Sequence, residues 1–445
     1  MFRLLIATLA VAVSATALPS TLPDPARISF KSDDQFEDYV DTWLATEQLQ
    51  WFNQTISSRS GCSLRVNGDF GQPQPVYLLR ARNTFLAPTG TTGQVRLNTG
   101  EEVIVSCPGP NRQIRHPNIV STVHTATARC VSNNLVSGVG WLNGNQAFGQ
   151  ITCSNHATFE TQQTNQRCFN NNVVIRTGFI VNNVFHVHYW SCFDTTRMEV
   201  LYVWYNQDVT NGIHQTGVGR PNNFFLAGPF FPGVNINNIY TQNNQRQVFA
   251  NLLGSNMVER YLTSTQFLAR GHLAAKTNYV FATGQRSTFY FINAAPQWQP
   301  FNAGNWMRLE INLRRRIAAA GYNTVIYTGT FGVTQLRNSA GRFIDIFLHS
   351  NNRVPVPEYF YKVVYDASRR RGTAFISINN PYYTLAEARQ RQFCTDRCRN
   401  NAAFNWINWQ PDRVDIGYSF CCTIPDFRRR IAHVPNFNVA NGLLS

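Results

Sequence analysis

Side chains suited to acid–base and phosphate chemistry gather between positions 269 and 316 of the 445-residue chain. Arg270-Gly271-His272 is followed by a series of amide, acidic and basic residues: Asn293, Asn302, Glu310 and Arg314. Hydrolysis of a phosphodiester needs a base for the attacking water, a cation to neutralise the phosphate, and fixed positive charge for the transition state. The segment contains a residue type for each of these tasks.

Each task can be assigned to a residue. His272 is the candidate general base, and because it acts while neutral, activity should fall at acid pH. Asn302 offers a hard amide oxygen to Mg²⁺, which keeps most of its waters and needs few protein ligands. Glu310 would hydrogen-bond those waters, and Arg270 and Arg314 would hold phosphate oxygens. A plainer interpretation makes Asn302 a helix cap, and Glu310 and Arg314 an exposed pair one turn apart.

Hydrophobic patterning indicates the elements that must position these residues. We expect strands over 266–272 and 288–292, a turn through Pro300 and Gly304, and a helix over 306–320. On that helix the amide, acidic and basic side chains would share one face, within reach of a histidine on a neighbouring strand.

The order and spacing of these residues resemble the DNA/RNA non-specific endonuclease family of the His-Me finger (ββα-metal) nucleases, and look most like its arthropod secreted double-stranded ribonuclease branch. The family's signature is an Asp-Arg-Gly-His strand, an Asn before a Pro-Gln, and a second Asn that opens a helix containing Arg-Leu-Glu. The matching positions are Arg270-Gly271-His272, Asn293, Pro296-Gln297, Asn302 and Arg308-Leu309-Glu310, with Arg314 one turn further on.

The resemblance implies a division of roles. His272 would be the base and Asn302 the sole direct metal ligand. Three further residues would support metal waters and phosphate: Asn293, Glu310 and Arg314. One position departs from the signature, because Ala269 stands where the family has aspartate, and we expect this to affect rate or metal affinity without removing the base. The family also uses an upstream phosphate-binding arginine, for which Arg220 is our candidate.

The expected fold class is α+β. A ββα-metal (His-Me finger) nuclease domain, with a central antiparallel sheet flanked by helices, would follow a disulfide-bonded all-β N-terminal domain. The expected boundaries are a signal peptide over 1–17, an acidic helical propeptide over 18–60, the β-rich domain over 61–175, the nuclease domain over 176–435 and a tail over 436–445.

Period-two alternation and turn residues give the further element predictions. Strands are expected over 76–79, 103–107, 119–130, 173–180, 200–205, 325–330, 343–348, 360–365 and 374–378, and a second helix over 384–400.

The first sixty residues differ from the rest of the chain. The start, MFRLLIATLAVAVSATALPS, has the features of a secretory signal peptide cut after Ala17, and its apolar run is too short to span a bilayer. Residues 18–60 are acidic, with a helix-like stretch over 33–51 and a basic cleavage point near Arg59. We interpret this segment as a propeptide whose acidic helix lies across a basic substrate groove and delays activity until secretion. The alternative is a plain N-terminal helix packed on the body.

Ten cysteines fit an exported protein with up to five disulfides. Four of them gather near the C-terminus and suggest a zinc site as an alternative, although secretion favours disulfides: Cys394, Cys398, Cys421 and Cys422. His186 and His188 would share one face of a strand, but the sequence places no third metal ligand beside them, so an ordinary strand face is favoured. Asn53 is the glycosylation acceptor.

The formal net charge of +15 is unevenly distributed. Residues 21–60 carry three basic and seven acidic side chains, whereas residues 61–445 carry 35 basic and 17 acidic ones. A basic body points to a polyanionic partner such as nucleic acid, a heparin-like sugar or an anionic membrane surface.

Residues and resemblance together predict a secreted, sugar-non-specific endonuclease that uses Mg²⁺, with Mn²⁺ as a substitute, on single- and double-stranded RNA and DNA, and leaves 5′-phosphate products. No membrane partner is expected. One alternative is a catalytically weakened secreted protein that binds polyanions or nucleic acid. Another is a phosphatase or phosphodiesterase of small molecules, which would need a narrow closed pocket. The joint presence of His272, Asn302 and Glu310 favours the endonuclease, because a pure binder has no physical reason to carry them.

Overall fold

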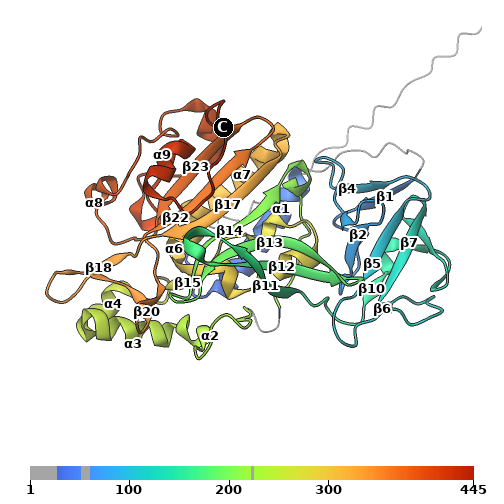
Figure 1. The fold of residues 1–445 in the computed structure, drawn as a ribbon, viewed down its shortest axis with the longest axis horizontal. Helices are drawn as coiled ribbons and strands as arrows, with labels where there is room; N and C mark the ends of the chain where they lie inside the picture. Colours follow the sequence, from blue (N-terminus) through green and yellow to red (C-terminus); the bar gives the residue numbers. More distant parts are fainter. Residues whose placement is uncertain (1–27, 52–60, 222–224) are drawn as a thin grey trace, which may run out of the picture.

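The structure is a computed structural model that describes residues 28–51, 61–221 and 225–445 (Figure 1). The expected signal peptide over 1–17, the acceptor Asn53 and the cleavage point at Arg59 lie outside the described residues. Within the described ranges, no helix is long and apolar enough to cross a membrane.

The part that follows Gly61 is β-rich and carries a six-stranded sheet of order β3-β2-β5-β7-β8-β9. Apolar side chains fill its interior beside two disulfides, Cys62–Cys130 and Cys107–Cys153. The strand predicted over 76–79 is confirmed, whereas only the second half of 119–130 is a strand. The strands are β1 (Cys62–Arg65), β2 (Val76–Leu79), β3 (Thr84–Phe85), β4 (Gln94–Leu97), β5 (Glu102–Ser106), β6 (Ile114–Arg115), β7 (Thr125–Ser132), β8 (Leu135–Gly138), β9 (Leu142–Ala147) and β10 (Thr152–Cys153).

An eight-stranded antiparallel sheet of order β11-β12-β13-β14-β17-β22-β23-β24 forms the centre of the larger part. It begins at Glu160, upstream of the domain boundary expected at residue 175. Every residue of β22 is buried, because helices pack on both faces of the sheet. The strands are β11 (Glu160–Arg167), β12 (Val173–Val181), β13 (Val184–Asp194), β14 (Glu199–Gln207), β17 (Thr324–Phe331), β22 (Tyr359–Asp366), β23 (Arg371–Ile378) and β24 (Ser419–Cys422).

A two-stranded antiparallel ribbon, β15 (Leu268–His272) with β16 (Ala294–Trp298), leads into α6 (Gln299–Phe301) and α7 (Met307–Ala320). The strand expected over 288–292 is wrong: residues 291–293 form a 3₁₀ turn and the strand starts at Ala294. Pro296 lies inside this strand, where a two-stranded ribbon tolerates its missing N–H.

The helix expected over 306–320 is confirmed as α7, but Asn302 does not continue its register. Residues 302–306 form a π-helical turn in which Gly304 leaves helical geometry. The extra residue breaks the i, i+4 spacing between Asn302 and the acidic and basic positions of α7. The single shared helix face expected from the sequence is therefore wrong for Asn302.

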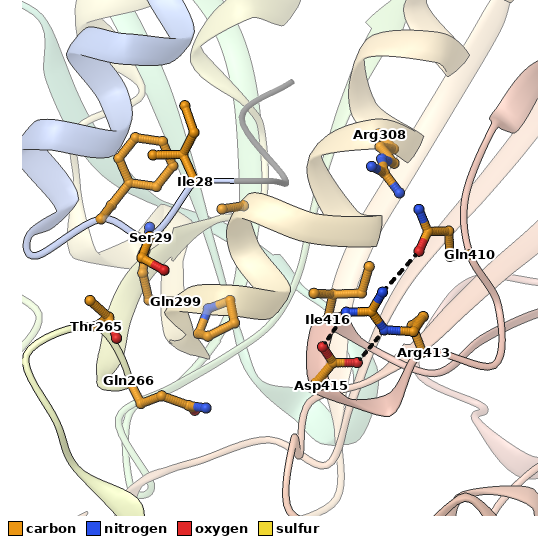
Figure 2. A pocket seen from close by; sticks show the side chains of 13 residues that line it. Ile28, Ser29, Thr265, Gln266, Gln299, Arg308, Gln410, Arg413, Asp415 and Ile416 are labelled. Carbon is orange, nitrogen blue, oxygen red and sulfur yellow. Dashed lines mark hydrogen bonds and ion pairs between the residues drawn. The ribbon is translucent and has the colours of Figure 1, made fainter. Parts of the chain in front are cut away.

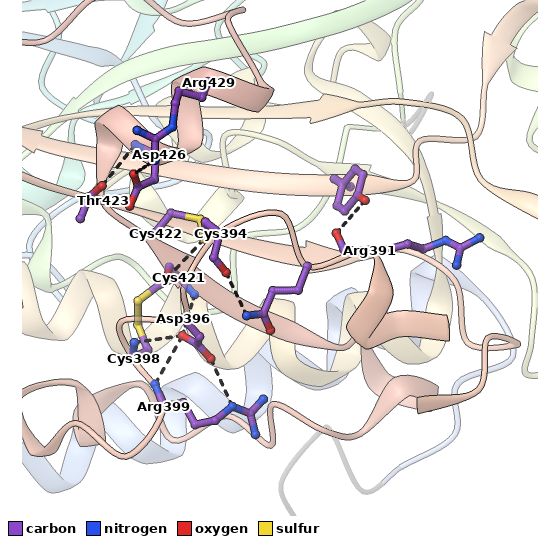
Figure 3. Close-up of a disulfide and its surroundings, with 12 residues drawn as sticks. Arg391, Cys394, Asp396, Cys398, Arg399, Cys421, Cys422, Thr423, Asp426 and Arg429 are labelled. Atoms are coloured by element: carbon purple, nitrogen blue, oxygen red, sulfur yellow. Dashed lines mark hydrogen bonds and ion pairs between the residues drawn. A yellow bond between two sulfur atoms is a disulfide. The ribbon is translucent and has the colours of Figure 1, made fainter. Parts of the chain in front are cut away.

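The second helix expected, over 384–400, ends early. Only α8 (Leu385–Gln390) forms, because the following segment is bound to β24 by two disulfides, Cys394–Cys422 and Cys398–Cys421 (Figure 3). Asp396 stabilises the turn between them by accepting the backbone N–H groups of Cys398 and Cys421. With Cys168–Cys192 at the edge of the large sheet, five disulfides take up all ten cysteines, so the zinc alternative is wrong.

The remaining elements lie around the ribbon and the large sheet (Figure 1). They are α2 (Ile236–Ile239), α3 (Gln242–Leu253), α4 (Val258–Tyr261), α5 (Ala282–Ser287), α9 (Ile424–Arg430), β18 (Gln335–Arg337), β19 (Phe343–Asp345), β20 (Phe347–His349) and β21 (Arg353–Pro355).

The N-terminal helix α1 (Asp33–Trp51) has the bounds expected from the sequence. It packs against the start of α7 (Figure 1). A small apolar cluster joins the two helices: Phe30, Phe36, Val40, Leu44, Ala303, Met307 and Ile311. The acidic side chains of α1 are thereby directed at the end of β15.

Candidate active site

His272 is the last residue of β15 and lies at the centre of the residues singled out from the sequence. Its ring is held between Phe225 and Phe289, with ring centroids 4.9 Å from each. The side chain is only 8% exposed, and its Nδ1 lies 3.4 Å from a carboxylate oxygen of Glu37 in α1. Nε2 is buried and has no hydrogen-bond partner among the described residues. Nδ1 is therefore the nitrogen that faces the site.

Asn293 fixes the backbone that follows His272. Its amide oxygen accepts the N–H of Ala274 at 2.8 Å, and its amide nitrogen donates to the carbonyls of Ala274 and Thr288 at 3.0 and 2.8 Å. The side chain is fully buried. These bonds tie the amide to the backbone on both sides of the turn after His272, and support of metal waters or phosphate by Asn293 stays a prediction.

Asn302 lies in the π-helical turn that precedes α7 and is partly exposed. Its amide nitrogen is 3.4 Å from the side-chain oxygen of Gln299, and its amide oxygen accepts no hydrogen bond from the described residues. The structure shows no side-chain cap at the start of α7, which excludes the helix-cap interpretation. A hard oxygen donor is thus left available beside the ribbon.

Glu310 forms a buried ion pair with Lys362 of β22, whose Nζ is 3.2 Å from Oε1 of the glutamate. Lys362 is itself 1% exposed, donates to Thr328 Oγ1 at 3.0 Å and lies 4.9 Å from the ring centre of Trp306. Burial raises the pKa of Glu310, and the charge of Lys362 opposes that rise. The exposed pair with Arg314 that the sequence allowed is wrong, because Lys362 is the partner.

Arg314 is buried in the body of the protein. Its Nη1 donates to the carbonyl of Thr277 at 2.7 Å, and only 2% of the residue is exposed. Burial, with the nearby charge of Arg315, lowers its pKa to about 9. Arg314 therefore holds the turn at 276–278 in place. Its positive charge is buried in the body of the protein.

Arg270 stands two residues before His272 on the same strand face. Its guanidinium lies 5.4 and 5.7 Å from the ring centres of Tyr240 and Phe291, and its Nη1 and backbone N–H both contact Asp33 of α1. The flanking aromatic rings orient the guanidinium towards the same surface as the histidine.

Lys276 was not assigned a role from the sequence, yet it lies in this cluster. Its Nζ donates to the carbonyl of Val218 at 2.7 Å and pairs with Asp41 of α1, and the residue is 4% exposed. Lys276 follows His272 by one short turn, in the segment ARGHLAAKTNY. This closeness to His272 in the sequence is the signal that could have identified it.

Arg220, the candidate upstream arginine, belongs to the same surface. It pairs with Asp34 and Asp38, the two carboxylates on the more exposed side of α1, and its charge contributes to lowering the pKa of Glu37. The structure thus brings three cationic side chains around His272: Arg220, Arg270 and Lys276.

The carboxylates of α1 that meet these groups are themselves perturbed. Burial raises the pKa of Asp33, with Arg270 lowering it in part, and raises that of Asp41 to about 6 against the effect of Lys276. For Glu37, burial also acts to raise the pKa, but the hydrogen bond and charge of His272 outweigh it, and the pKa is lowered. The site electrostatically favours an anion at the position of Glu37.

A cavity of about 550 Å³ opens beside this cluster, between α6, the segment before α1 and the loop 410–416 (Figure 2). Gln299 and Ala303 line it, so it adjoins the turn that carries Asn302. On its far side, Figure 2 shows Arg413 held by Asp415 and Gln410. The cavity is open to solvent, and its lining combines polar and apolar side chains with Arg308 and the Arg413–Asp415 pair.

The pair His186 and His188 lies elsewhere. Their rings pack with Phe85 and Phe179 in the contact between β13 and the β-rich part, and burial lowers the pKa of His188 to about 3. Among the described residues, the sole group of three that could approach a metal is Asp396 with Cys398 and Cys421, and those sulfurs are joined in a disulfide. The ordinary strand-face interpretation accounts for the histidine pair.

Comparison with known proteins now places the chain. The family described as DNA/RNA non-specific endonuclease matches residues 170–427, more than half of the chain. The chain belongs to this family. The match begins within the first strands of the eight-stranded sheet and includes the ribbon, α7 and β24.

Relatives of this endonuclease-family chain include insect salivary proteins. A salivary endonuclease of Lutzomyia longipalpis is 25% identical over 391 residues, which cover 86% of each chain. Salivary protein Tsal1 of Glossina morsitans morsitans is 26% identical over 411 residues, covering 87% of this chain and 95% of the relative. Mitochondrial endonuclease G of Caenorhabditis elegans is 37% identical, over 98 residues that cover 21% of this chain and 31% of the relative.

Ala269, the one departure from the signature of this endonuclease family, lies inside the core. It is 1% exposed and stands opposite Gln297 in the ribbon. The side-chain amide of Gln297 is buried with neither atom hydrogen-bonded to a described residue. The Gln297 side chain lies closely against Gly271, two residues from Ala269 along the same strand.

Proposed function

We propose that this chain is a secreted, metal-dependent endonuclease that hydrolyses phosphodiester bonds of RNA and DNA, double-stranded RNA included, to 5′-phosphate products. The observation that carries the proposal is the setting of His272. Its Nδ1 faces a surface flanked by Arg270 and Lys276, and Glu310 is close enough for its charge to interact with that of His272. Membership of the endonuclease family supports the reaction class. The salivary relatives and the five disulfides support secretion.

His272 would act as the general base. In its neutral form, Nδ1 removes a proton from a water molecule while Nε2 keeps its own proton between the two aromatic rings. Arg270 and Lys276 would bind oxygens of the phosphate and stabilise the charge that grows on it. The water attacks in line, the 3′ oxygen leaves, and no 2′-hydroxyl takes part, so DNA and RNA are both substrates.

The oxygen donors beside the histidine fit a hard divalent cation. Asn302 has an amide oxygen without a hydrogen bond to the described residues, and Oε1 of Glu310 is buried with no hydrogen bond, although it is paired with Lys362. Asn302 would hold Mg²⁺ directly, and Glu310 would hold its waters, with Mn²⁺ as a substitute. When bound, the ion would neutralise the phosphate and polarise it towards attack.

A non-catalytic polyanion binder is the second candidate, and Ala269 is the observation that favours it. The core at that position lacks the carboxylate of the family signature, and the cross-strand residue Gln297 has no hydrogen bond to a described residue. Such a protein would bind nucleic acid through the same cationic surface and release it intact.

Both candidates are tested by incubating the protein with long double-stranded RNA and with DNA, in Mg²⁺ or EDTA, beside the His272→Ala variant. The intact chain and the chain cut between α1 and the β-rich part are both assayed. We expect the cut, unsubstituted chain to cleave both nucleic acids in Mg²⁺ and neither of them in EDTA. Cleavage that survives EDTA or the substitution would overturn the mechanism, and tight binding without cleavage in every form would establish the second candidate.

A further inference from the structure

The acidic face of α1 matches the catalytic surface residue for residue. Asp33 contacts Arg270, Glu37 contacts His272, and Asp41 contacts Lys276. Carboxylates four residues apart on a helix are about 6 Å apart along its axis. Alternate residues on a strand, such as Arg270 and His272, are spaced by about 6.5 Å. The spacing of Asp33 and Glu37 on α1 therefore matches the spacing of the two residues that they contact. The register of α1 over β15 is thus set by two matching periods.

While α1 lies in this register, the groups that would perform the reaction are covered. The side chains of Arg270, His272 and Lys276 are 16%, 8% and 4% exposed, and the carboxylate of Glu37 lies against the nitrogen proposed as the base. A phosphate cannot reach His272 without displacing that carboxylate. The proposed function therefore requires α1 to leave.

The attachment of α1 is suited to release. Apart from the ion pairs, it is held by the apolar cluster with the start of α7. The outer pairs, Arg220 with Asp34 and Asp38, involve carboxylates that are 56% and 72% exposed. Pairs of that kind contribute little to stability and weaken as salt rises. The basic residue Arg59 lies in the nine residues that join α1 to Gly61.

We propose that α1 is an internal inhibitor that occupies the nucleic-acid site as a mimic of a polyanionic strand, and that cutting it from the chain activates the enzyme. This inference rests on the proposed function. A row of carboxylates on one helix face presents negative charges at regular intervals, as the phosphates of a nucleic-acid strand do. Lys276 and Arg220 are thereby assigned to the substrate-binding surface, because they hold the mimic together with Arg270.

The linkage to the body makes the inhibition effective. A tethered helix rebinds at a high effective concentration, so a free substrate competes poorly with it. After cleavage the helix is diluted into solution, and the same ion pairs no longer suffice to exclude a long polyanion that makes many contacts at once.

The test uses the full chain with a recognition sequence for a specific protease in place of residues 53–58. Initial rates of cleavage of double-stranded RNA in Mg²⁺ are compared before cutting, after cutting, and after the helix has been removed by gel filtration at raised salt. Affinity for the same fluorescein-labelled RNA is measured in EDTA by anisotropy. We expect both the rate and the affinity to rise by roughly tenfold or more when the helix is removed, as for loss of a buried charged partner. A synthetic peptide of residues 28–51 should reverse both changes.

A matched pair of variants separates register from overall charge. Glu37→Gln removes the carboxylate from His272. Combining it with Gln35→Glu restores the net charge of α1 but places the carboxylate on the exposed face of the helix. Both variants should activate the uncut chain to the same degree, with unchanged thermal unfolding. The control Glu259→Gln, in an exposed ion pair with Arg246, should leave the uncut chain inhibited.

The outcomes distinguish this inference from the proposed function. Equal affinities and equal, measurable rates before and after removal of α1 would overturn the inhibitor and leave the nuclease standing. A rise in RNA affinity with no cleavage in any arm would support the inhibitor and overturn the nuclease. Inhibition retained by the charge-restored double variant would show that net charge, and not the register over β15, governs the contact.

Discussion

The two sides of the site are built differently. The ribbon and α7 are embedded in the largest apolar cluster of the protein, in which Trp298, Trp306 and Phe289 are fully buried. The opposing helix α1 is held by a row of ion pairs and a cluster of seven buried apolar residues. Close packing resists rearrangement, whereas the outer ion pairs of α1, whose carboxylates are more than half exposed, exchange readily with ions and water. The catalytic side is thus preorganised and the covering side is removable.

The largest effect is expected from breaking the preorganised side at its centre. In protein from which α1 has been removed, His272→Ala should lower kcat by about 10²–10⁴-fold, since that is the usual contribution of a general base. Nucleic-acid affinity and thermal unfolding should be retained, because the cationic groups around it remain. Single-turnover kinetics on double-stranded RNA measure the step directly. A loss of less than about tenfold would assign the base to another residue.

Removal of the metal site should have the next largest effect. Even partners that support a metal through its waters usually contribute roughly 10–100-fold, so Asn302→Ala should cost more than about 100-fold in rate at low Mg²⁺. Raising Mg²⁺ should restore part of the rate, which a merely structural asparagine would not allow. Asn305→Ala is the matched control, because Asn305 lies in the same turn but binds the carbonyls of Gln410 and Gly417.

Breaking the buried pair behind the site should alter its pH dependence. Lys362→Met leaves Glu310 buried without its cation, which typically destabilises a protein by about 3–5 kcal/mol. The charge of Lys362 lowers the pKa of Glu310, so the variant's pKa should be higher and the acid limb of kcat/KM should move to higher pH. The variant's stability also depends on pH through Glu310. Because the pKa of Glu310 is higher in the folded than in the unfolded chain, the destabilisation is largest at high pH, where Glu310 is charged, and diminishes as Glu310 is protonated.

Rate–pH profiles and urea unfolding at several pH values measure the two effects of Lys362→Met. Adding Glu310→Gln should recover stability without recovering rate. An unshifted acid limb, with stability lost, would show that Lys362 has a structural role alone.

The sequence was sufficient for the features that depend on local pattern. The bounds of α1, the end of β15 at His272 and the helix after Trp306 follow from hydrophobic periodicity and the spacing of a short motif. Family membership, which rests on that motif and on the longer match, was anticipated for the same reason.

What the sequence did not reveal depends on tertiary contact. Lys362 reaches Glu310 from a strand 52 positions away along the chain, and no local pattern links them. The π-helical turn at Asn302 inserts one residue that periodicity alone cannot detect. The helix expected to 400 was lost because disulfides to β24 override its local propensity. The acidity of residues 18–60 predicted a groove contact, but not which cation each carboxylate meets.

The smallest effect is expected where the two sides meet at the surface. Arg220→Gln removes the outer pairs with Asp34 and Asp38, which are worth at most about 1 kcal/mol, so the intact chain should be activated by no more than about fivefold. In protein without α1 the same change should weaken nucleic-acid binding about equally for all sequences and reduce the salt dependence of binding by about one phosphate contact. Anisotropy titrations at several salt concentrations measure the slope. An unchanged slope would remove Arg220 from the substrate surface, and the inner contacts of Arg270 and Lys276 would then account for the whole of α1's register.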